Sequence, residues 1–283
     1  MSPKTPNATS PIPAGVKTVI TPRVPQDIID EILDHLAANS DSESLKACAL
    51  VSRSWIPSCQ QHLFHTIDFT SRSMDGWSNT FPVPEESPAH RVRDLRIWIE
   101  GLSHVPDKFF GHTPSFTNAR KLSFLGPGRL LEFRTLSRWR LPESATSLTI
   151  DTAVVTLVEI RNIMAQLPNL DDLSIWGPMA PVERGGLLGI GTALRGRFGG
   201  KLVLRGLHCA NKGFMDMLLK IPTGLHFTEV DIRCARKCLP SIVRFVEVCG
   251  ETIVKLSSTV NSSCMFHSFS QSGWSQYHYC AKY

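Results

Sequence analysis

The sequence predicts a fold of the α+β or α/β class, in which a three-helix module near the N-terminus precedes an irregular solenoid of repeats. Two observations lead to this prediction. Residues 24–69 combine apolar patterns typical of helices with a short alternating strand. From residue 95 onward, a motif of two apolar residues separated by one other residue recurs every 24 to 29 residues. Each recurrence predicts a strand, and several of the stretches between them have the spacing of helices.

The first helix of the module is predicted to begin near Pro25. Proline suits the first turn of a helix, because the N–H that it lacks would make no hydrogen bond there. A stripe of apolar side chains follows, formed by Ile28, Ile29, Ile32, Leu33 and Leu36. This stripe is wider than one buried face requires, so it predicts a helix with apolar side chains on two adjoining faces.

Two further helices and a strand complete the predicted module. Ser40 stands three residues before Glu43, which is the pattern of a capping box at the start of a helix. The apolar residues of that second helix are Leu45, Cys48, Ala49 and Val51. A third helix is predicted from the four-residue spacing of Trp55, Cys59 and Leu63, with Pro57 in its first turn. Residues 64–69, FHTIDF, alternate as a strand does.

The repeats are defined by seven apolar pairs. These are Leu95/Ile97, Leu122/Phe124, Leu148/Ile150, Leu173/Ile175, Leu202/Leu204, Val230/Ile232 and Val254/Leu256. Their period lies in the range of leucine-rich repeats, although the usual Asn or Cys is mostly missing, so the repeat is irregular. The alternative for this region is an α/β domain without solenoid order, because short apolar pairs also recur by chance. Residues 156–170, 213–222 and 242–250 have apolar spacings typical of helices and end at proline or glycine.

Composition changes divide the chain into five predicted parts. Residues 1–22 are rich in Pro, Ser and Thr and predict a disordered tail. The helical module occupies 23–70, a proline-rich linker 71–90, and a leucine-rich-repeat-like domain 91–260. Residues 261–283 break the period and predict a poorly ordered C-terminal tail. Two alternatives stay open for that end: the solenoid is short, or the chain stops early.

Charge and composition narrow the classes of partner. The net charge of +5 is too small to indicate nucleic-acid binding, and no stretch of 18 apolar residues indicates a membrane span. The N-terminus has no apolar run typical of a secretory signal. We therefore expect a cytoplasmic or nuclear protein with free thiols, which binds neither nucleic acid nor membrane. Residues 24–70 carry a net charge of −5 and the remainder +10, so the two modules should differ in surface charge.

The order of these motifs in residues 23–70 resembles the F-box. Val24-Pro25 stands where that family has Leu-Pro, which is a mild departure. The apolar stripe follows, residues 51–55 (VSRSW) match the Val-Ser-Arg-x-Trp signature, and Leu63-Phe64 matches the closing pair. The resemblance covers about a sixth of the chain. Combined with irregular repeats, the layout is similar to F-box proteins with leucine-rich-like repeats that are abundant in mushroom-forming fungi.

The resemblance implies a function. An F-box docks on the adaptor subunit of a cullin–RING ubiquitin ligase, and the downstream domain captures a target protein, here unknown. The residues expected to build or present the adaptor-binding surface are Val24, Pro25, Ile28, Ile32, Leu33, Leu36, Leu45, Cys48, Val51, Ser52 and Trp55. We expect no enzymatic activity, cofactor or metal. The alternative is a leucine-rich-repeat interaction protein whose helical module is only a structural cap.

Several other motifs have simpler explanations. The glycine-rich residues 185–191 lack the Lys-Ser/Thr of a phosphate-binding loop. Cys234 and Cys238 lack a second ligand pair at zinc-finger spacing. A looser set in the C-terminal tail is interpreted as coincidence: Cys264, His267, His278 and Cys280. Arginines and one lysine cluster at 91–96, 129–140 and 195–205, where a solvated surface competes with a site for an acidic or phosphorylated target.

Overall fold

A computed structural model describes residues 24–99, 109, 111–129, 140–176, 179–180, 198–205, 212–221, 224–261, 265–270 and 277–279. The tail predicted for residues 1–22 lies outside this range. No helix among the described residues is long and apolar enough to cross a membrane.

Three helices form the N-terminal module, as the apolar spacing predicted. They are α1 (Gln26–Ala38), α2 (Ser42–Val51) and α3 (Ile56–Leu63). Ile29, Leu33, Leu45 and Cys59 are buried together between them, with half-buried apolar neighbours packed around this small core. Each helix contributes at least one of the four side chains, so the module has a core of its own.

The start of α2 differs in detail from the prediction. The capping residue is Asp41, whose carboxylate accepts a hydrogen bond from the backbone N–H of Ser44 at 3.0 Å. The predicted cap, Ser40, instead has a positive φ of 57° in the turn before the helix. An aspartate one residue further on is an equally good cap, and the helix begins directly after it.

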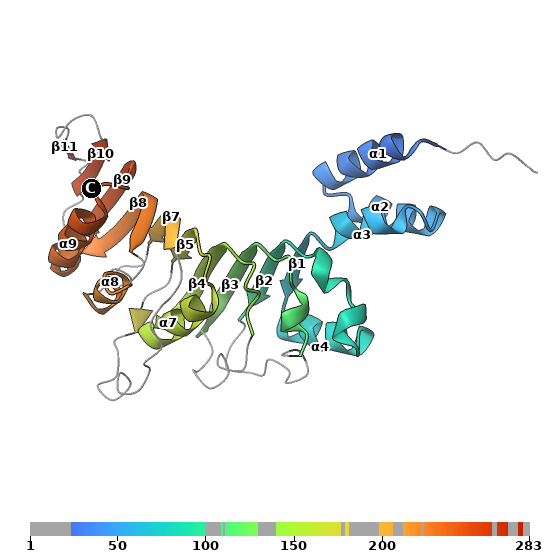
Figure 1. The fold of residues 1–283 in the computed structure, drawn as a ribbon, viewed down its shortest axis with the longest axis horizontal. Helices are drawn as coiled ribbons and strands as arrows, with labels where there is room; N and C mark the ends of the chain where they lie inside the picture. Colours follow the sequence, from blue (N-terminus) through green and yellow to red (C-terminus); the bar gives the residue numbers. More distant parts are fainter. Residues whose placement is uncertain are drawn as a thin grey trace, which may run out of the picture.

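One sheet with eight parallel strands runs through the rest of the described chain (Figure 1). Its parallel strands are β1 (Thr66–Phe69), β2 (Asp94–Trp98), β3 (Lys121–Arg129), β4 (Ser147–Thr156), β5 (Asp172–Ile175), β7 (Phe198–Leu204), β8 (Leu225–Ala235) and β9 (Lys255–Asn261). They lie side by side in chain order. A further strand of two residues, β6 (Met179–Ala180), pairs with the end of β4.

The register of the sheet aligns the apolar pairs found in the sequence. Leu95 pairs with Leu122, Leu122 with Leu148, and Leu148 with Leu173. The alignment continues through Leu202 and Val230 to Leu256. The strands predicted around these pairs are therefore confirmed, and the aligned apolar side chains form the buried face of the sheet. Val254, the first member of the last predicted pair, is an exception, because it precedes β9 and is 60% exposed.

The predicted fold class is nevertheless wrong. We expected a helical F-box followed by a leucine-rich-repeat-like solenoid, whereas the described residues show an α/β arrangement of one parallel sheet with helices. The reason lies in β1, which was expected to close the helical module. β1 instead pairs in parallel with β2, so the sheet starts inside that module. The described connections also differ from one strand to the next, which a regular repeat would not show.

Three helices between the later strands cover the apolar face of the sheet. They are α7 (Leu157–Gln166), α8 (Lys212–Leu218) and α9 (Leu239–Cys249), close to the predicted helical segments. Ile160, Phe214 and Phe245 bring these helices into one core with the strands. The opposite face of the sheet, which carries the alternate side chains, is called the open face below.

The predicted linker 71–90 contains ordered structure. It holds helix α4 (Ser71–Thr80) and two 3₁₀ helices, η1 (Pro84–Glu86) and η2 (Pro88–Arg91). Trp77 of α4 lies edge-on to Phe69 of β1, with ring centres 5.4 Å apart. Phe109 and Phe116 extend this aromatic cluster, which η3 (Thr113–Ser115) borders. The polar sequence concealed the buried face because α4 buries only a few of its side chains.

Two short strands are described within residues 261–283, the segment for which poor order was expected. β9 is followed by β10 (Met265–Ser270) and β11 (Tyr277–Tyr279), both antiparallel to their neighbours. The change from parallel to antiparallel pairing ends the run of strands that share the apolar register. The break in sequence period at residue 261 corresponds to this change.

Candidate partner-docking surfaces

Helix α1 divides its apolar stripe between the interior and the solvent. Ile29 and Leu33 point into the small core of the module. Ile28 and Ile32, one residue before each of them, leave 44% and 46% of their surface exposed. Neighbouring residues on a helix are separated by about 100°, so one broad stripe serves two faces. This is the arrangement that the width of the stripe predicted.

The polar side of α1 is held against α3. Asp30 accepts a hydrogen bond from the Ser58 hydroxyl at 3.1 Å, and His62 lies 3.1 Å from the Asp34 carboxylate. These contacts orient α1 around its axis. The exposed isoleucines are consequently directed away from α3 and remain available to a partner.

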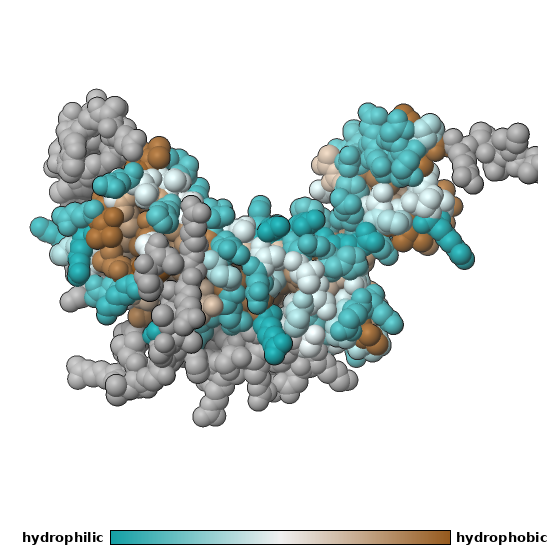
Figure 2. All heavy atoms as spheres, in the orientation of Figure 1, coloured by the Kyte–Doolittle hydropathy of each residue, from teal (hydrophilic) through white to brown (hydrophobic). Residues whose placement is uncertain are grey.

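The end of α2 adds two strongly exposed apolar residues. Leu50 is 88% exposed and Val51 69% exposed. The short connection between α1 and α2 makes them a hairpin, so the start of α1 and the end of α2 lie at the same end of the module (Figure 1). Figure 2 shows apolar side chains at the surface there. We call the exposed set the helical patch: Val24, Ile28, Ile32, Leu50 and Val51.

The residues predicted to bind an adaptor separate into two groups. Leu33 and Leu45 are buried in the core of the module, and Leu36, Cys48 and Trp55 pack against it. The remaining apolar residues that were predicted, together with Pro25, are exposed: Val24, Ile28, Ile32 and Val51. Ser52 is half-buried, and its hydroxyl lies 2.9 Å from that of Ser54. The first group supports the helices, and only the second is accessible to another protein.

Leu50 was not among the residues predicted to bind an adaptor. It follows Leu45 by five residues, which on a helix places it well away from the buried side of α2. An apolar side chain off the buried stripe is the signal that could have identified it. Its exposure is larger than that of any other large apolar residue in the described chain.

The open face of the sheet is a second candidate surface, rich in charge. Its ionisable residues on β1–β5 are Asp68, Asp94, Arg96, Lys121, Asp151 and Asp172. On β7–β9, and immediately after β7, they are Lys201, Arg205, Glu229, Asp231, Arg233 and Lys255. The first group is mainly acidic and the second mainly basic, so the charge of the face changes sign between β5 and β7.

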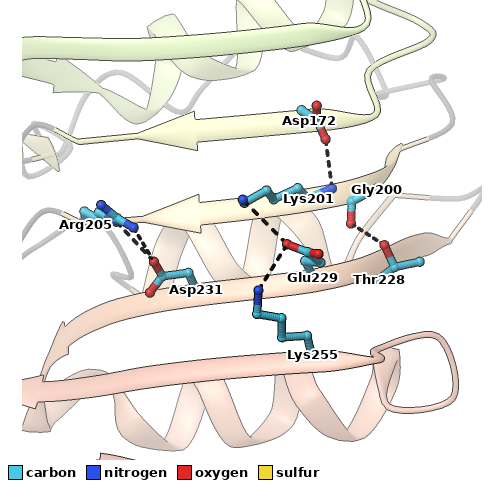
Figure 3. Close-up of polar contacts among 8 residues, drawn as sticks. All are labelled: Asp172, Gly200, Lys201, Arg205, Thr228, Glu229, Asp231 and Lys255. Atoms are coloured by element: carbon cyan, nitrogen blue, oxygen red, sulfur yellow. Dashed lines mark hydrogen bonds and ion pairs between the residues drawn. The ribbon is translucent and has the colours of Figure 1, made fainter. Parts of the chain in front are cut away.

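Several of these charges are paired within the face (Figure 3). The Glu229 carboxylate lies 3.5 Å from Lys201 Nζ and 3.9 Å from Lys255 Nζ. Arg205 donates to Asp231 Oδ2 from two nitrogens, at 2.9 Å and 3.1 Å. These half-exposed pairs hold the side chains in place without removing the overall basic character of this half.

Two tryptophans stand on the open face, at the carboxyl ends of their strands. Trp98 of β2 is 40% exposed and Trp176 directly after β5 is 42% exposed. The Arg205 guanidinium lies 4.6 Å from the ring centre of Trp176, a cation–π contact. Trp98 Nε1 donates to Asp68 Oδ1 at 3.4 Å. Exposed tryptophan and arginine side chains held in place are typical of protein-binding surfaces.

Asp94 and Arg96 hold the acidic end of the open face together. Arg96 Nη2 lies 2.9 Å from Asp94 Oδ2, and its Nη1 lies 4.0 Å from Asp68. The hydrogen bond to Asp94 raises the pKa of Arg96, so this guanidinium stays charged. One arginine therefore lies close to two carboxylates, so this end of the open face keeps an excess of negative charge.

The other sequence candidates form no reactive site in the described structure. Cys234 and Cys238 are buried, and burial raises the pKa of the Cys234 thiol to about 11, which disfavours the reactive thiolate. No cluster of three metal-ligating side chains exists among the described residues. The glycine-rich segment 185–191 and the cysteines at 264 and 280 lie outside that range. So do Arg134, Arg138, Arg195 and Arg197.

Comparisons with known proteins identify no relative. No protein-family model, curated protein sequence or solved structure matches the chain.

Proposed function

We propose that this chain is a substrate-receptor subunit of a cullin–RING ubiquitin ligase. The helical patch binds the adaptor subunit, and the open face of the sheet captures a target protein. The observation that supports the proposal is the patch itself, in which Ile28 and Ile32 of α1 and Leu50 of α2 are exposed on helices that have a core of their own. The sequence of these helices is also the part of the chain that resembles the F-box.

Apolar side chains that are exposed together in this way favour the binding of a partner protein. Burying one large aliphatic side chain contributes about 1.5–3 kcal/mol, so several exposed together offer a substantial driving force for association. The core of the module does not need them, since Ile29, Leu33, Leu45 and Cys59 already fill it. The patch therefore has no evident role in stabilising the module.

The proposed role requires no chemistry from this chain. The ligase partners supply the ubiquitin transfer, and the chain raises the effective concentration of a target near them. Neither a cofactor nor a metal enters the proposal. The whole function consists of two simultaneous binding events, one on the helices and one on the sheet.

A structural cap is the alternative role for the helices. Two observations favour it: β1 pairs directly with β2, and Arg91 Nη1 donates to the backbone carbonyl of Pro57 in α3 at 2.9 Å. Helices anchored in this way could shield the end of the sheet. This alternative predicts no binding to the adaptor.

Calorimetry with the purified adaptor subunit tests the proposal. We expect micromolar or tighter binding by the wild type. Ile32→Asp and Leu50→Asp should each weaken binding at least about thirtyfold, because each places a charge in an apolar contact. Val243→Asp is the matched control, since Val243 is similarly exposed on α9, outside the module.

Folding must be checked alongside binding. Trp55→Ala removes a side chain that packs against the module core, so its effect on binding should come with a loss of helix stability. Ile32→Asp should leave the circular dichroism spectrum and the melting temperature nearly unchanged. Absence of wild-type binding at about 100 μM, or equal weakening by Val243→Asp, would contradict the proposal.

A further inference from the structure

We propose that the target segment bound on the open face is itself bipolar, with a basic half over β1–β5 and an acidic half over β7–β9. This inference rests on the proposed function, because it specifies the target that the sheet would capture. It names a class of partner: a protein segment that runs across the strands, carries opposite charges at its two ends and is apolar between them.

The charge division of the open face supports this choice. β1–β5 present Asp68, Asp94, Asp151 and Asp172 against two basic side chains. Basic side chains outnumber acidic ones on β7–β9. Two acidic side chains there are accompanied by four basic ones: Lys201, Arg205, Arg233 and Lys255. A segment of uniform charge would be repelled at one end, whereas a bipolar one is attracted at both.

A second copy of this chain fits the face less well. Charge opposition between two copies requires a two-fold axis parallel to the strands, which places β2 opposite β8 and β3 opposite β7. Asp94 would then face Glu229, and Lys121 would face Lys201, because these residues share one row of the register. Like charges would meet at both places, whereas Arg96 facing Asp231 would supply one attraction, so a different protein is the better occupant.

Trp176 defines the middle of the segment. Trp176 lies near the centre of the eight parallel strands, with Arg205 stacked on it, and Trp98 lies toward the acidic end. From β2 to β8 there are five strand spacings, or about 24 Å. A helix of about 16 residues covers that distance. Apolar side chains in its middle would contact Trp176.

A designed peptide provides the probe. It is a helix of about 18 residues with glutamates in its first half, lysines in its second half and leucines on one side of the middle. The control peptide has the same composition with its charges intermixed. Fluorescence anisotropy of the labelled peptides should show the bipolar peptide binding at least about tenfold more tightly than the control at low salt.

Charge reversal in the protein locates the site. Asp151 is exposed and forms no ion pair within the part of the chain that the structure describes. Asp151→Lys and Arg233→Glu should each weaken the binding of the bipolar peptide about three- to tenfold. Glu247→Lys and Arg244→Glu are matched controls, because both residues are exposed on α9 away from the open face, and they should change affinity less than twofold.

Carbodiimide cross-linking then tests the orientation, since this reagent joins carboxylates to amines. Peptide lysines should be linked to Asp151 or Asp68, and peptide glutamates to Lys201 or Lys255. Links in the opposite sense, equal binding of the two peptides, or no binding at about 1 mM would overturn the inference. So would a salt-sensitive dimer of the protein that Asp151→Lys abolishes.

These outcomes are separable from failure of the proposed function. Adaptor binding depends on Ile32 and Leu50, and Asp151→Lys should leave it unchanged. If the adaptor binds and the bipolar peptide does not, only the inference about the target is wrong. If the peptide binds and the adaptor does not, the sheet remains a binding surface and the ligase role is wrong.

Discussion

Gly200 occupies a position in β7 that a larger residue could enter only with strain. Its φ is +65°, and a Cβ atom there would lie 2.4 Å from the backbone oxygen of Asp171. The register with β8 shifts at this residue, and its carbonyl accepts a hydrogen bond from the Thr228 hydroxyl at 3.1 Å. The two nearest atoms belong to the backbone of Asp171, which cannot move aside as the end of a flexible side chain could, so the clash is difficult to relieve.

We expect Gly200→Ala to lower the free energy of unfolding by about 2 kcal/mol or more, from left-handed strain and the backbone clash. Gly76→Ala is the control. Gly76 lies in α4 with nothing within 4 Å of an added Cβ, so alanine there should raise stability by about 0.5–1 kcal/mol. Urea unfolding of both variants measures this, and equal effects would argue against the role of Gly200.

His112 is buried beside the aromatic cluster. It stacks on Phe109 with ring centres 6.5 Å apart, and its Nδ1 has no hydrogen-bond partner among the described residues. Burial lowers the pKa of His112, and the charge of Glu85 opposes this only in part. The folded protein therefore binds a proton on this ring less readily than the unfolded chain does.

The lowered pKa of His112 determines the direction in which the stability changes with pH. At pH values well above 6.5, the ordinary pKa of histidine, the His112 imidazole is neutral in both the folded and the unfolded state and does not lower the free energy of unfolding. As the pH falls below that value, the unfolded chain takes up the proton first, so the free energy of unfolding should decrease. His112→Phe should reduce this decrease, measured by urea unfolding between about pH 7.5 and pH 5. Parallel curves for variant and wild type would contradict the role of His112.

At the scale of elements, α7 begins with a complete capping box. The Thr156 hydroxyl accepts a hydrogen bond from the Glu159 backbone N–H at 3.2 Å, and the Glu159 carboxylate accepts one from the Thr156 N–H at 2.6 Å. Thr156 ends β4, so the box also determines how the chain passes from the sheet into the helix.

We expect Thr156→Ala to destabilise the protein by about 1 kcal/mol, the usual cost of losing an N-cap. Thr156→Ser keeps the hydroxyl and should retain most of that stability. Thermal unfolding of the two variants gives the comparison. A serine variant as unstable as the alanine variant would mean that the methyl group of Thr156, and not its hydroxyl, is what matters.

At the scale of the whole molecule, two apolar cores differ greatly in size. The core of the helical module consists of four buried residues, whereas the core of the sheet runs from Phe69 to Val260. β1 and Arg91 connect the two. A small core gives low local stability, so the helices should open without unfolding of the sheet.

Hydrogen exchange measured by mass spectrometry should show this difference. Amides of α1–α3 are expected to exchange with a smaller opening free energy than those of β4 and β8. Leu33→Ala should accelerate exchange only in the helices, whereas Phe124→Ala should cost about 3–5 kcal/mol and accelerate exchange throughout the sheet. If Leu33→Ala accelerated hydrogen exchange in the sheet as much as in the helices, the two cores would form a single cooperative unit.

Much of the local structure could be predicted from the sequence. The apolar pairs around Leu122, Leu148 and Leu202 indicated strands, and the register confirms them. The spacing in residues 157–166 indicated α7. The broad stripe on α1 indicated exposed as well as buried isoleucines, although it did not say which residues were which. These features depend on periodicity, which neighbouring residues determine.

Only the tertiary structure decided how these elements combine. β1 belongs to the sheet, Trp77 in the expected linker is buried, and the predicted adaptor-binding set separates into core residues and exposed ones. Leu50 and the charge division of the open face became visible only with the packing and the register. Strand partners and buried faces depend on contacts between residues far apart in the chain. Periodicity shows which side of an element is apolar, but not what covers it.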